Sequence, residues 1–289
     1  MMGRVLGTKK LLGWLAVFCS TFFFYFATVV IRLAEGEVDI DVSYFAFFRF
    51  ILGFIVVSII MLISRQPVRP RRYHFLLGRM LANTAAVYCF YKAASLGSVA
   101  EANILNMTYP LFVACASWFL FKSQRDWVVA ALVALAFVGV WLVLNPGGDF
   151  SVNGQSIWGL ASGMLAAAAI IYLNLCRIDH DSNTILFVLF GLGSIVMYTF
   201  FHNYIFWPNG KEFYYLMLCG APGVIGQYLI TFGFRFVTAV EGSVISSSRI
   251  MLAALLGPII IGEPSLALLG WCGGFCIFVA NVGLAMRKK

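Results

Sequence analysis

The chain has 289 residues, of which 62% are hydrophobic and only 11% are charged, and its formal net charge at pH 7 is +8. A soluble domain is close to half apolar and about a quarter charged, and this chain has too few charges to coat a globule of its length. The composition therefore excludes a water-soluble protein and predicts an integral membrane protein.

Ten apolar runs follow one another along the chain, each near the ~20 residues that cross a bilayer as an α-helix. In chain order they are Leu11–Ile31, Ser43–Ile63, His74–Ser95, Ala100–Phe121, Trp127–Leu144, Ser156–Leu175, Thr184–Tyr204, Glu212–Arg235, Val240–Ile261 and Leu266–Met286. The runs are apolar on every face, so we predict an all-α membrane protein with ten transmembrane helices rather than a barrel of alternating strands. The first run has no small-residue cleavage site, and we expect it to be retained as a helix.

The distribution of Lys and Arg predicts the orientation of these spans, since cytoplasmic loops carry an excess of both. With the N-terminus inside, the outer side keeps only Arg32, Lys92 and Lys211, together with the acidic loop 35–41. The inner side collects Arg4, Lys9, Lys10, Arg65, Arg69, Arg71, Arg72, Arg79, Lys122, Arg125, Arg177, Arg235, Arg287, Lys288 and Lys289. We therefore expect a protein of the bacterial inner membrane with both termini cytoplasmic. The basic residues are scattered over helix ends and loops, which argues against binding nucleic acid.

The cysteines and histidines do not have the spacing of a metal site. All seven cysteines lie inside predicted helices, where a small apolar filler is the usual role. The three histidines, His74, His180 and His202, lie near the ends of spans. We therefore expect no metal and no cofactor. A small-molecule substrate and the lipid bilayer are the expected partners, and the oligomeric state, monomer or homodimer, stays open.

Two stretches 140 residues apart resemble each other: VAEANILNMTYPLFVACASWFLF at 99–121 and AVEGSVISSSRIMLAALLGPIII at 239–261. Each begins with small residues and a single glutamate, Glu101 or Glu241, and continues through a short polar patch into apolar sequence. They form the fourth and the ninth spans, and because the step from one to the other is five spans, an odd number, they run in opposite directions. We predict two inverted five-helix repeats, residues 1–145 and 146–289, divided near the linker NPGGD.

Polar residues follow one face of each of these two spans. Asn103, Asn106 and Tyr109 lie at positions i, i+3 and i+6 of the fourth span. The corresponding positions of the ninth span hold Ser243, Ser246 and Arg249. Because lipid offers such groups no hydrogen-bond partner, we expect both faces to line a wet cavity or to hold helices together.

Three longer stretches resemble a known family: FFRFILGFIVV at 47–57, YKAASLGSVAEANILNMTYPLF at 91–112 and FRFVTAVEGSVISSSRIMLAALLGPIIIGEP at 234–264. Together they are similar to the EamA-type ten-helix transporters of the drug/metabolite transporter superfamily, over nearly the whole chain. The resemblance implies a carrier of small metabolites, often an exporter, that works without ATP hydrolysis. The chain departs from the family pattern at Lys122 and Ser123, where a Gly-Glu pair is frequent, and at Ile250, the counterpart of Pro110.

Arg249 is the leading candidate for the substrate site. It lies near the centre of the ninth span, where a guanidinium costs several kcal/mol unless it is paired or hydrated. Its planar fork suits a carboxylate or a phosphate, and the alternative is a structural pair within the protein. Arg49 lies in the outer half of the second span, and we expect a structural role such as pairing with the acidic outer loop.

The other candidates are polar or aromatic side chains at membrane depth, each of which can line a cavity or connect helices. As substrate-binding residues we name Asn106, Ser246, Asn103, Tyr109, Asn83, Tyr88, Gln227 and Tyr172. Glu101 and Glu241 suit the positive end of a helix dipole in the first turn of their spans. Their alternative role is proton coupling, which needs a carboxyl whose pKa is raised by partial burial.

We predict a secondary transporter, exporter or importer, of a small metabolite such as an amino acid or another anionic or zwitterionic compound. It would work by alternating access, with one half rocking against the other. One alternative is a membrane-embedded enzyme acting on a lipid, although the chain lacks the constellation of acids, bases or metal ligands that such an enzyme needs. Another is a quaternary-amine or drug transporter with an aromatic cage, against which the buried Arg249 argues.

Overall fold

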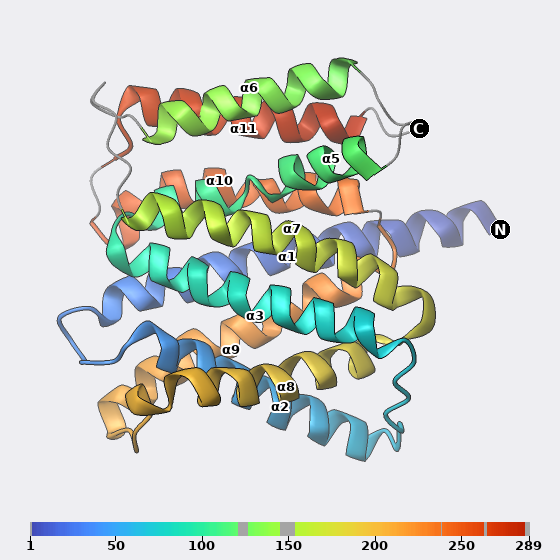
Figure 1. Ribbon diagram of the computed structural model, residues 1–289, viewed down its shortest axis with the longest axis vertical. Helices are drawn as coiled ribbons and strands as arrows, with labels where there is room; N and C mark the ends of the chain where they lie inside the picture. Colours follow the sequence, from blue (N-terminus) through green and yellow to red (C-terminus); the bar gives the residue numbers. More distant parts are fainter. Residues whose placement is uncertain (1, 121–126, 145–153, 238, 263–264, 287–289) are drawn as a thin grey trace.

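The computed structural model describes residues 2–120, 127–144, 154–237, 239–262 and 265–286, and within these ranges the chain is helical, without strands (Figure 1). The helices are α1 (Met2–Ala34), α2 (Val42–Ile63), α3 (Tyr73–Leu96), α4 (Val99–Asn106), α5 (Tyr109–Leu120), α6 (Trp127–Leu144), α7 (Gly154–Asp179), α8 (Ser182–Phe201), α9 (Gly210–Gly233), α10 (Ala239–Ile260) and α11 (Leu268–Met286), with a short 3₁₀ turn at His202–Tyr204. Helices α4 and α5 share one crossing of the bundle, so the described helices make ten crossings.

The helices lie side by side and run between the same two ends of the molecule, and both chain termini lie at one of these ends (Figure 1). Within the described residues, five helices are long and apolar enough to span a membrane by length and composition: Lys10–Ala34, Val42–Ile63, Gly154–Asp179, Ser182–Tyr204 and Gly210–Gly233. Shorter apolar helices cover Ala131–Val143, Ile245–Ile260 and Leu268–Gly283. Large apolar side chains on the outside, such as Leu62, Phe200 and Ile259, are mostly exposed, as a lipid-facing surface requires. The predicted all-α membrane fold is confirmed.

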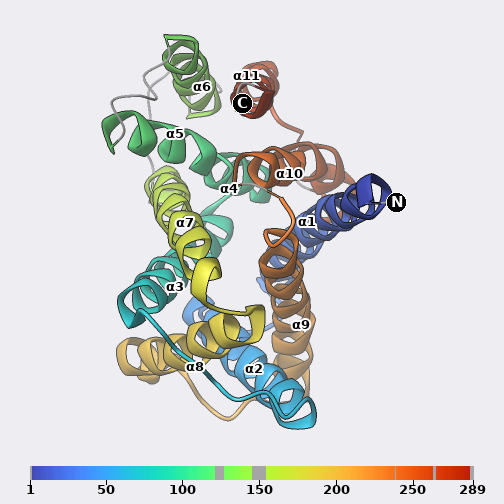
Figure 2. The ribbon, with the colours of Figure 1, turned by 90° about the vertical axis from the view of Figure 1, so that its right-hand side faces the viewer.

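The pattern of helix contacts is repeated: each of the largest contacts between crossings has a counterpart in which both crossings are shifted by five along the chain. Helix α3 packs on α7 as α9 packs on α1, and α3 packs on α8 as α9 packs on α2. Helix α4 packs on α7 as α10 packs on α1, while α2 with α8 and α6 with α11 form the two pairs that repeat onto themselves (Figure 2). The crossing α4–α5 and helix α10 run in opposite directions (Figure 1). These contacts confirm the predicted inverted five-helix repeats.

The two repeats interleave instead of forming separate bodies. The largest contacts of α1, α2 and α3 are with α9, α8 and α7, which all belong to the second repeat. A motion in which the whole of residues 1–145 rocks against residues 146–289 would therefore break most of the packing. The division of the chain at residues 145 and 146 itself falls outside the described residues and stays a prediction.

The fourth crossing is broken in the middle. We expected one helix over 100–121, but α4 ends at Asn106 and α5 begins at Tyr109. The physical reason is Pro110, which has no N–H to donate to the carbonyl of Asn106. The Thr108 side chain instead turns its hydroxyl to the Leu105 carbonyl at 2.6 Å. Asn281 of α11 donates its Nδ2 to the Met107 carbonyl at 3.2 Å, so a side chain replaces part of the lost backbone pairing.

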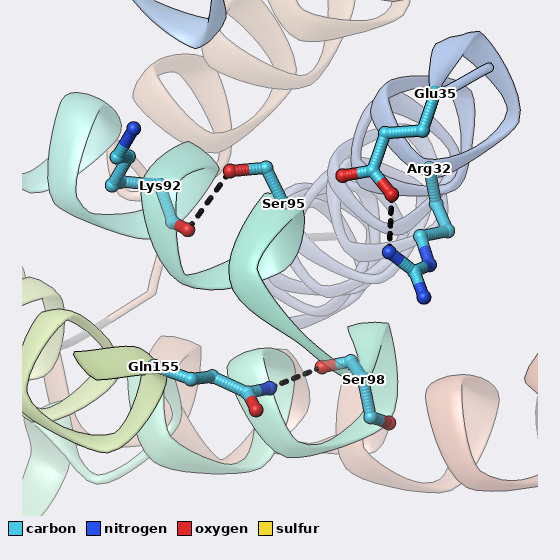
Figure 3. A network of polar contacts seen from close by, with 6 residues as sticks. All are labelled: Arg32, Glu35, Lys92, Ser95, Ser98 and Gln155. Atoms are coloured by element: carbon cyan, nitrogen blue, oxygen red, sulfur yellow. Dashed lines mark hydrogen bonds and ion pairs between the residues drawn. The ribbon is translucent and has the colours of Figure 1, made fainter. Parts of the chain in front are cut away.

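The end of the bundle that holds the acidic loop is fixed by caps and ion pairs. Figure 3 shows Gln155 of α7 donating to the Ser98 carbonyl at 2.8 Å, beside the ion pair of Arg32 and Glu35. Lys211 at the start of α9 also reaches this loop, with its Nζ 2.7 Å from a Glu37 oxygen. These contacts place Arg32 and Lys211 at the acidic end, as the charge distribution predicts.

Candidate functional site

A buried pocket lies where the broken crossing α4–α5 meets α1, α2, α3, α7, α9 and α10. Its cavity volume is about 90 Å³. Its polar lining comprises Thr21, Arg49, Arg79, Asn83, Asn106, Tyr109, Gln227, Ser246 and Arg249. The break at Met107 and Thr108 therefore adjoins the pocket, the position that discontinuous helices occupy in transporters with inverted repeats.

Arg249 connects the ninth crossing to the broken one. Its Nη2 donates to Asn106 Oδ1, and Asn106 Nδ2 donates to the Ser162 hydroxyl of α7 at 3.0 Å. The Arg249 guanidinium carbon lies 4.9 Å from the centre of the Phe90 ring, a cation–π contact. Arg249 is only 4% exposed, and its Nε has no hydrogen-bond partner in the described structure. Neutral groups thus hold the guanidinium in place without neutralising it.

Arg49 reaches the same pocket from α2. Its Nη1 donates to the Tyr91 hydroxyl and its Nη2 to Gln227 Oε1, both at 3.2 Å. Gly223 of α9 leaves room for this side chain, because a Cβ there would lie 2.8 Å from the Arg49 Cδ. The expectation that Arg49 pairs with the acidic outer loop is therefore wrong. The guanidinium turns into the protein, where it finds the Tyr91 hydroxyl and the Gln227 amide.

Arg79 is the residue that sequence reasoning misplaced. We assigned it to the inner face, among the basic residues of loops and helix ends. The structure places it on α3 against the pocket, only 2% exposed. Within the described part of the chain its guanidinium makes no hydrogen bond or ion pair, and its Nε is buried without a partner. A rise of 1.5 Å per residue puts position 79 about 9 Å below the start of α3, a depth that argues against the helix end.

The unsatisfied groups of the pocket are mostly N–H donors. The buried nitrogens without a partner in the described structure are Nε of Arg49, Arg79 and Arg249, Nδ2 of Asn83 and Nε2 of Gln227. The first residue of α5, Tyr109, also lines the pocket, so the positive end of that helix dipole points towards it. Among the described lining residues there is no carboxylate. The described lining of the pocket is therefore positively charged and rich in N–H donors.

Three sequence-predicted site residues lie outside this pocket. Asn103 is fully buried and donates its Nδ2 to the Val99 carbonyl and to the Thr28 hydroxyl of α1. Tyr88 stacks on Phe201 and contacts Trp158 edge-on. Tyr172 packs at Gly78, where a Cβ would come within 2.5 Å of its ring. Each of the three side chains connects neighbouring helices.

Of the two glutamates considered for coupling, Glu101 is not among the described pocket-lining residues. Glu101 lies in the first turn of α4, after the cap Ser98, where a carboxylate suits the helix dipole. Glu241 lies in the first turn of α10, and its side chain is outside the described residues, as is that of Ser243. In the described part of the chain no three His, Cys, Asp or Glu side chains gather in a way that could hold a metal ion.

Comparison with known proteins finds similarity over almost the whole chain. The model of the EamA-like transporter family matches residues 11–145 and 155–286. The Pseudopaline exporter CntI of Pseudomonas aeruginosa is 24% identical over 276 residues, which cover 95% of this chain and 96% of that protein. Solute carrier family 35 member G1 of Homo sapiens is 23% identical over 297 residues, which cover 96% and 80%. A solved crystal structure is 17% identical, with a TM-score of 0.63 over 98% of this chain and 99% of that chain, and this likeness shows the fold alone.

Proposed function

The chain belongs to the EamA-like transporter family of the drug/metabolite transporter superfamily, and on that premise we propose that it is a secondary transporter of a small anionic or zwitterionic metabolite. Family and relatives are transporters and not enzymes, so the chain is an integral membrane transporter. The substrate class, the direction and the mechanism are the parts that we propose.

One observation supports the proposed substrate class: the buried pocket presents arginines and unpaired N–H donors without a carboxylate in its described lining. A guanidinium at membrane depth is stable only with a partner or water. An anionic group of the substrate would supply that partner through charge-assisted hydrogen bonds. Arg249, Asn106, Ser246, Gln227, Asn83 and Tyr109 are the predicted site residues in contact with this pocket.

The alternative of a quaternary-amine or drug transporter with an aromatic cage is less well supported. Aromatic rings do border the site, but Phe24 and Phe90 already lie against guanidinium groups. A permanently cationic substrate would meet like charges in a low-dielectric pocket. An amino acid remains compatible, since its carboxylate can bind at the arginines.

We propose export across the bacterial inner membrane, with both termini on the cytoplasmic side. The similarity to an exporter supports the direction, and the excess of Lys and Arg at the ends and loops of one side supports the orientation. Alternating access would move individual helices around the pocket, because the repeats interleave. The broken crossing α4–α5 has fewer backbone hydrogen bonds to lose than a continuous helix, so we propose it as the moving element.

The test begins with a ligand screen on the purified protein. Heating the protein with amino acids, organic acids, neutral sugars and quaternary amines should raise the unfolding temperature only with compounds that bear an anionic group. A ligand at 100 times its Kd stabilises the folded state by about 2.7 kcal/mol. The best ligand is then followed into proteoliposomes containing wild type, Arg249→Gln or Arg235→Gln.

Arg235 is the matched control, because it is an exposed arginine that is not among the pocket-lining residues. We expect Arg249→Gln to reduce uptake of the labelled ligand at least tenfold and Arg235→Gln to leave it within twofold. Stabilisation by quaternary amines alone, or full transport by Arg249→Gln, would overturn the proposal.

A further inference from the structure

The pocket holds three positive charges, Arg49, Arg79 and Arg249, each at most 4% exposed. Arginine stays protonated in proteins, so these groups cannot relieve their mutual repulsion by losing a proton. Removing one partner of a buried charge pair is strongly destabilising because a charge is left uncompensated. Three such charges in one pocket indicate that their partners arrive with the ligand.

The contacts within the protein satisfy the three arginines unequally. Arg249 donates to an amide oxygen of Asn106, and Arg49 donates to Tyr91 and Gln227. Arg79 has no hydrogen-bond or ion-pair partner among the described residues, although its side chain is buried against the pocket. All the partners that do exist are neutral, so the positive charge of the pocket remains.

Two of the three guanidinium groups lie close to a common ring, and the third enters the pocket from another helix. Arg49 and Arg249 share one aromatic neighbour, with their guanidinium carbons 5.2 and 5.9 Å from the centre of the Phe24 ring. Arg79 lines the same pocket from α3 and, among the described residues, makes no ring contact of this kind. One compact anionic group can therefore engage Arg49 and Arg249, but Arg79 needs a second group.

We infer that the transported compound carries at least two separate anionic groups, such as a dicarboxylate or tricarboxylate, and that Arg79 is the residue that selects for the second one. This inference rests on the proposed function and narrows its substrate class. A monocarboxylate would leave Arg79 uncompensated in the loaded pocket. A compound with spaced carboxylates would pair with Arg49 and Arg249 through one group and with Arg79 through the other.

The test compares ligands that differ in charge but little in size. Butanoate, succinate, tricarballylate and the neutral succinamide are added to the detergent-purified protein at pH 8, where every carboxyl is ionised. Methylenediphosphonate is added as a ligand whose negative charges lie close together. Ionic strength is held constant in all samples, because added salt itself screens charges. The readout is the unfolding temperature as a function of ligand concentration, from which apparent Kd values follow.

We expect succinate or tricarballylate to bind at least about tenfold tighter than butanoate, which corresponds to one further charge-assisted pair. Succinamide should not bind, and methylenediphosphonate should bind more weakly than the spaced carboxylates. Arg79→Gln should weaken succinate binding more than butanoate binding and so abolish the advantage of succinate, and Arg79→Lys should restore part of that advantage. The control Arg235→Gln should keep the wild-type order.

A second readout separates ligand selection from a structural role. Because Arg79 is a buried charge without a partner in the described structure, Arg79→Met should raise the unfolding temperature of the ligand-free protein by a few degrees. If Arg79 were structural, Arg79→Met would lower it, and that result would overturn the assignment of Arg79.

The ligand comparison in wild type decides the inference even where a variant fails to fold. Equal affinity for butanoate and succinate would overturn the inference and leave the proposed anionic transporter standing. Tighter binding of methylenediphosphonate than of tricarballylate would overturn the spaced arrangement of charges. Binding of neutral or cationic compounds with no binding of any anion would overturn the inference and the proposed function together.

Discussion

The fourth crossing, α4–α5, and the ninth crossing, α10, occupy equivalent places in the two repeats but are built differently. The fourth crossing is interrupted at Met107 and Thr108, while α10 is a continuous helix of 22 residues. At the decisive position the fourth crossing has Pro110 and the ninth has Ile250. Helix α10 does contain a proline, Pro258, but it lies near the last turn.

Because of this difference, the two crossings contribute different groups to the pocket. The continuous helix holds the charge, since a buried guanidinium needs a rigid support, and Arg249 projects from the middle of α10. The broken crossing supplies polar groups beside its break, among them Asn106, the last residue of α4, whose Oδ1 accepts a hydrogen bond from Arg249 Nη2. The two crossings thus occupy equivalent places in the packing, while their polar side chains differ and meet at the contact between Arg249 and Asn106.

The largest expected effect comes from breaking α10 as the fourth crossing is broken. Ile250→Pro should cost about 3 kcal/mol or more, because it removes a backbone hydrogen bond and places the ring against the preceding turn. Ile250 is buried, so Ile250→Val serves as the control and should cost about 0.5–1.5 kcal/mol. Thermal unfolding of the purified variants measures both. An unchanged unfolding temperature for Ile250→Pro would show that α10 tolerates a break and would remove the contrast.

The next largest loss of stability is expected from breaking the hydrogen bond between Arg249 and Asn106, which connects the two crossings. A hydrogen bond that involves a charged group contributes about 1.5–3 kcal/mol, so Asn106→Leu should destabilise the protein by leaving Arg249 without that acceptor. In the Asn106→Leu background, Arg249→Met should restore stability. A double-mutant cycle measured by thermal unfolding gives the coupling energy. Strictly additive effects would mean that the contact between the crossings carries no energy.

The packing around the break gives a smaller effect. At Gly163 of α7 an added Cβ would lie 2.6 Å from the Thr108 hydroxyl and 2.9 Å from the Leu105 carbonyl oxygen. Gly163→Ala should therefore cost about 1–3 kcal/mol through overpacking against the unwound segment. Gly210→Ala is the matched control, since nothing lies within 4 Å of its added Cβ. Equal unfolding temperatures for the two variants would mean that the break is loosely packed.

The smallest effect is expected far from both crossings, at the ion pair of Lys211 and Glu37. The hydrogen bond and the charge of Lys211 lower the pKa of the exposed Glu37 carboxyl. The contribution of the pair to stability is therefore present above the ordinary carboxyl pKa and is lost as the pH falls through the lowered pKa. Lys211→Met should leave the unfolding temperature unchanged within error at pH 7, because exposed pairs contribute little. A large loss would show that this end of the bundle, and not the pocket, limits stability.

The helices could be predicted from the sequence because apolar runs of spanning length leave few alternatives. The runs at 43–63, 127–144 and 240–261 agree with α2, α6 and α10 to within a residue or so. The break in the fourth crossing could not be predicted in the same way. Hydropathy does not register a proline that removes one hydrogen bond, although Pro110 itself is visible in the sequence.

The pocket could be predicted in part. Arg249 was found because a central charge in an apolar run has few explanations. Arg79 was missed because it follows a basic loop, and a charge within two turns of a helix end resembles a side chain that extends to the membrane surface. Tyr88 and Tyr172 were predicted to line the pocket because of their depth in the membrane, but they do not. Depth in the membrane does not tell which face of a helix a ring occupies, and both rings pack on neighbouring helices instead.

The interleaving of the repeats has a consequence for biogenesis. Helices α1, α2 and α3 leave the ribosome first, yet their main packing partners α9, α8 and α7 are translated later. During that interval Arg49 and Arg79 face lipid or the insertion machinery without the pocket that later encloses them. We therefore expect a chain truncated near residue 150 to be unstable in the bilayer, because it lacks the parts of α7, α9 and α10 that line the pocket around these arginines.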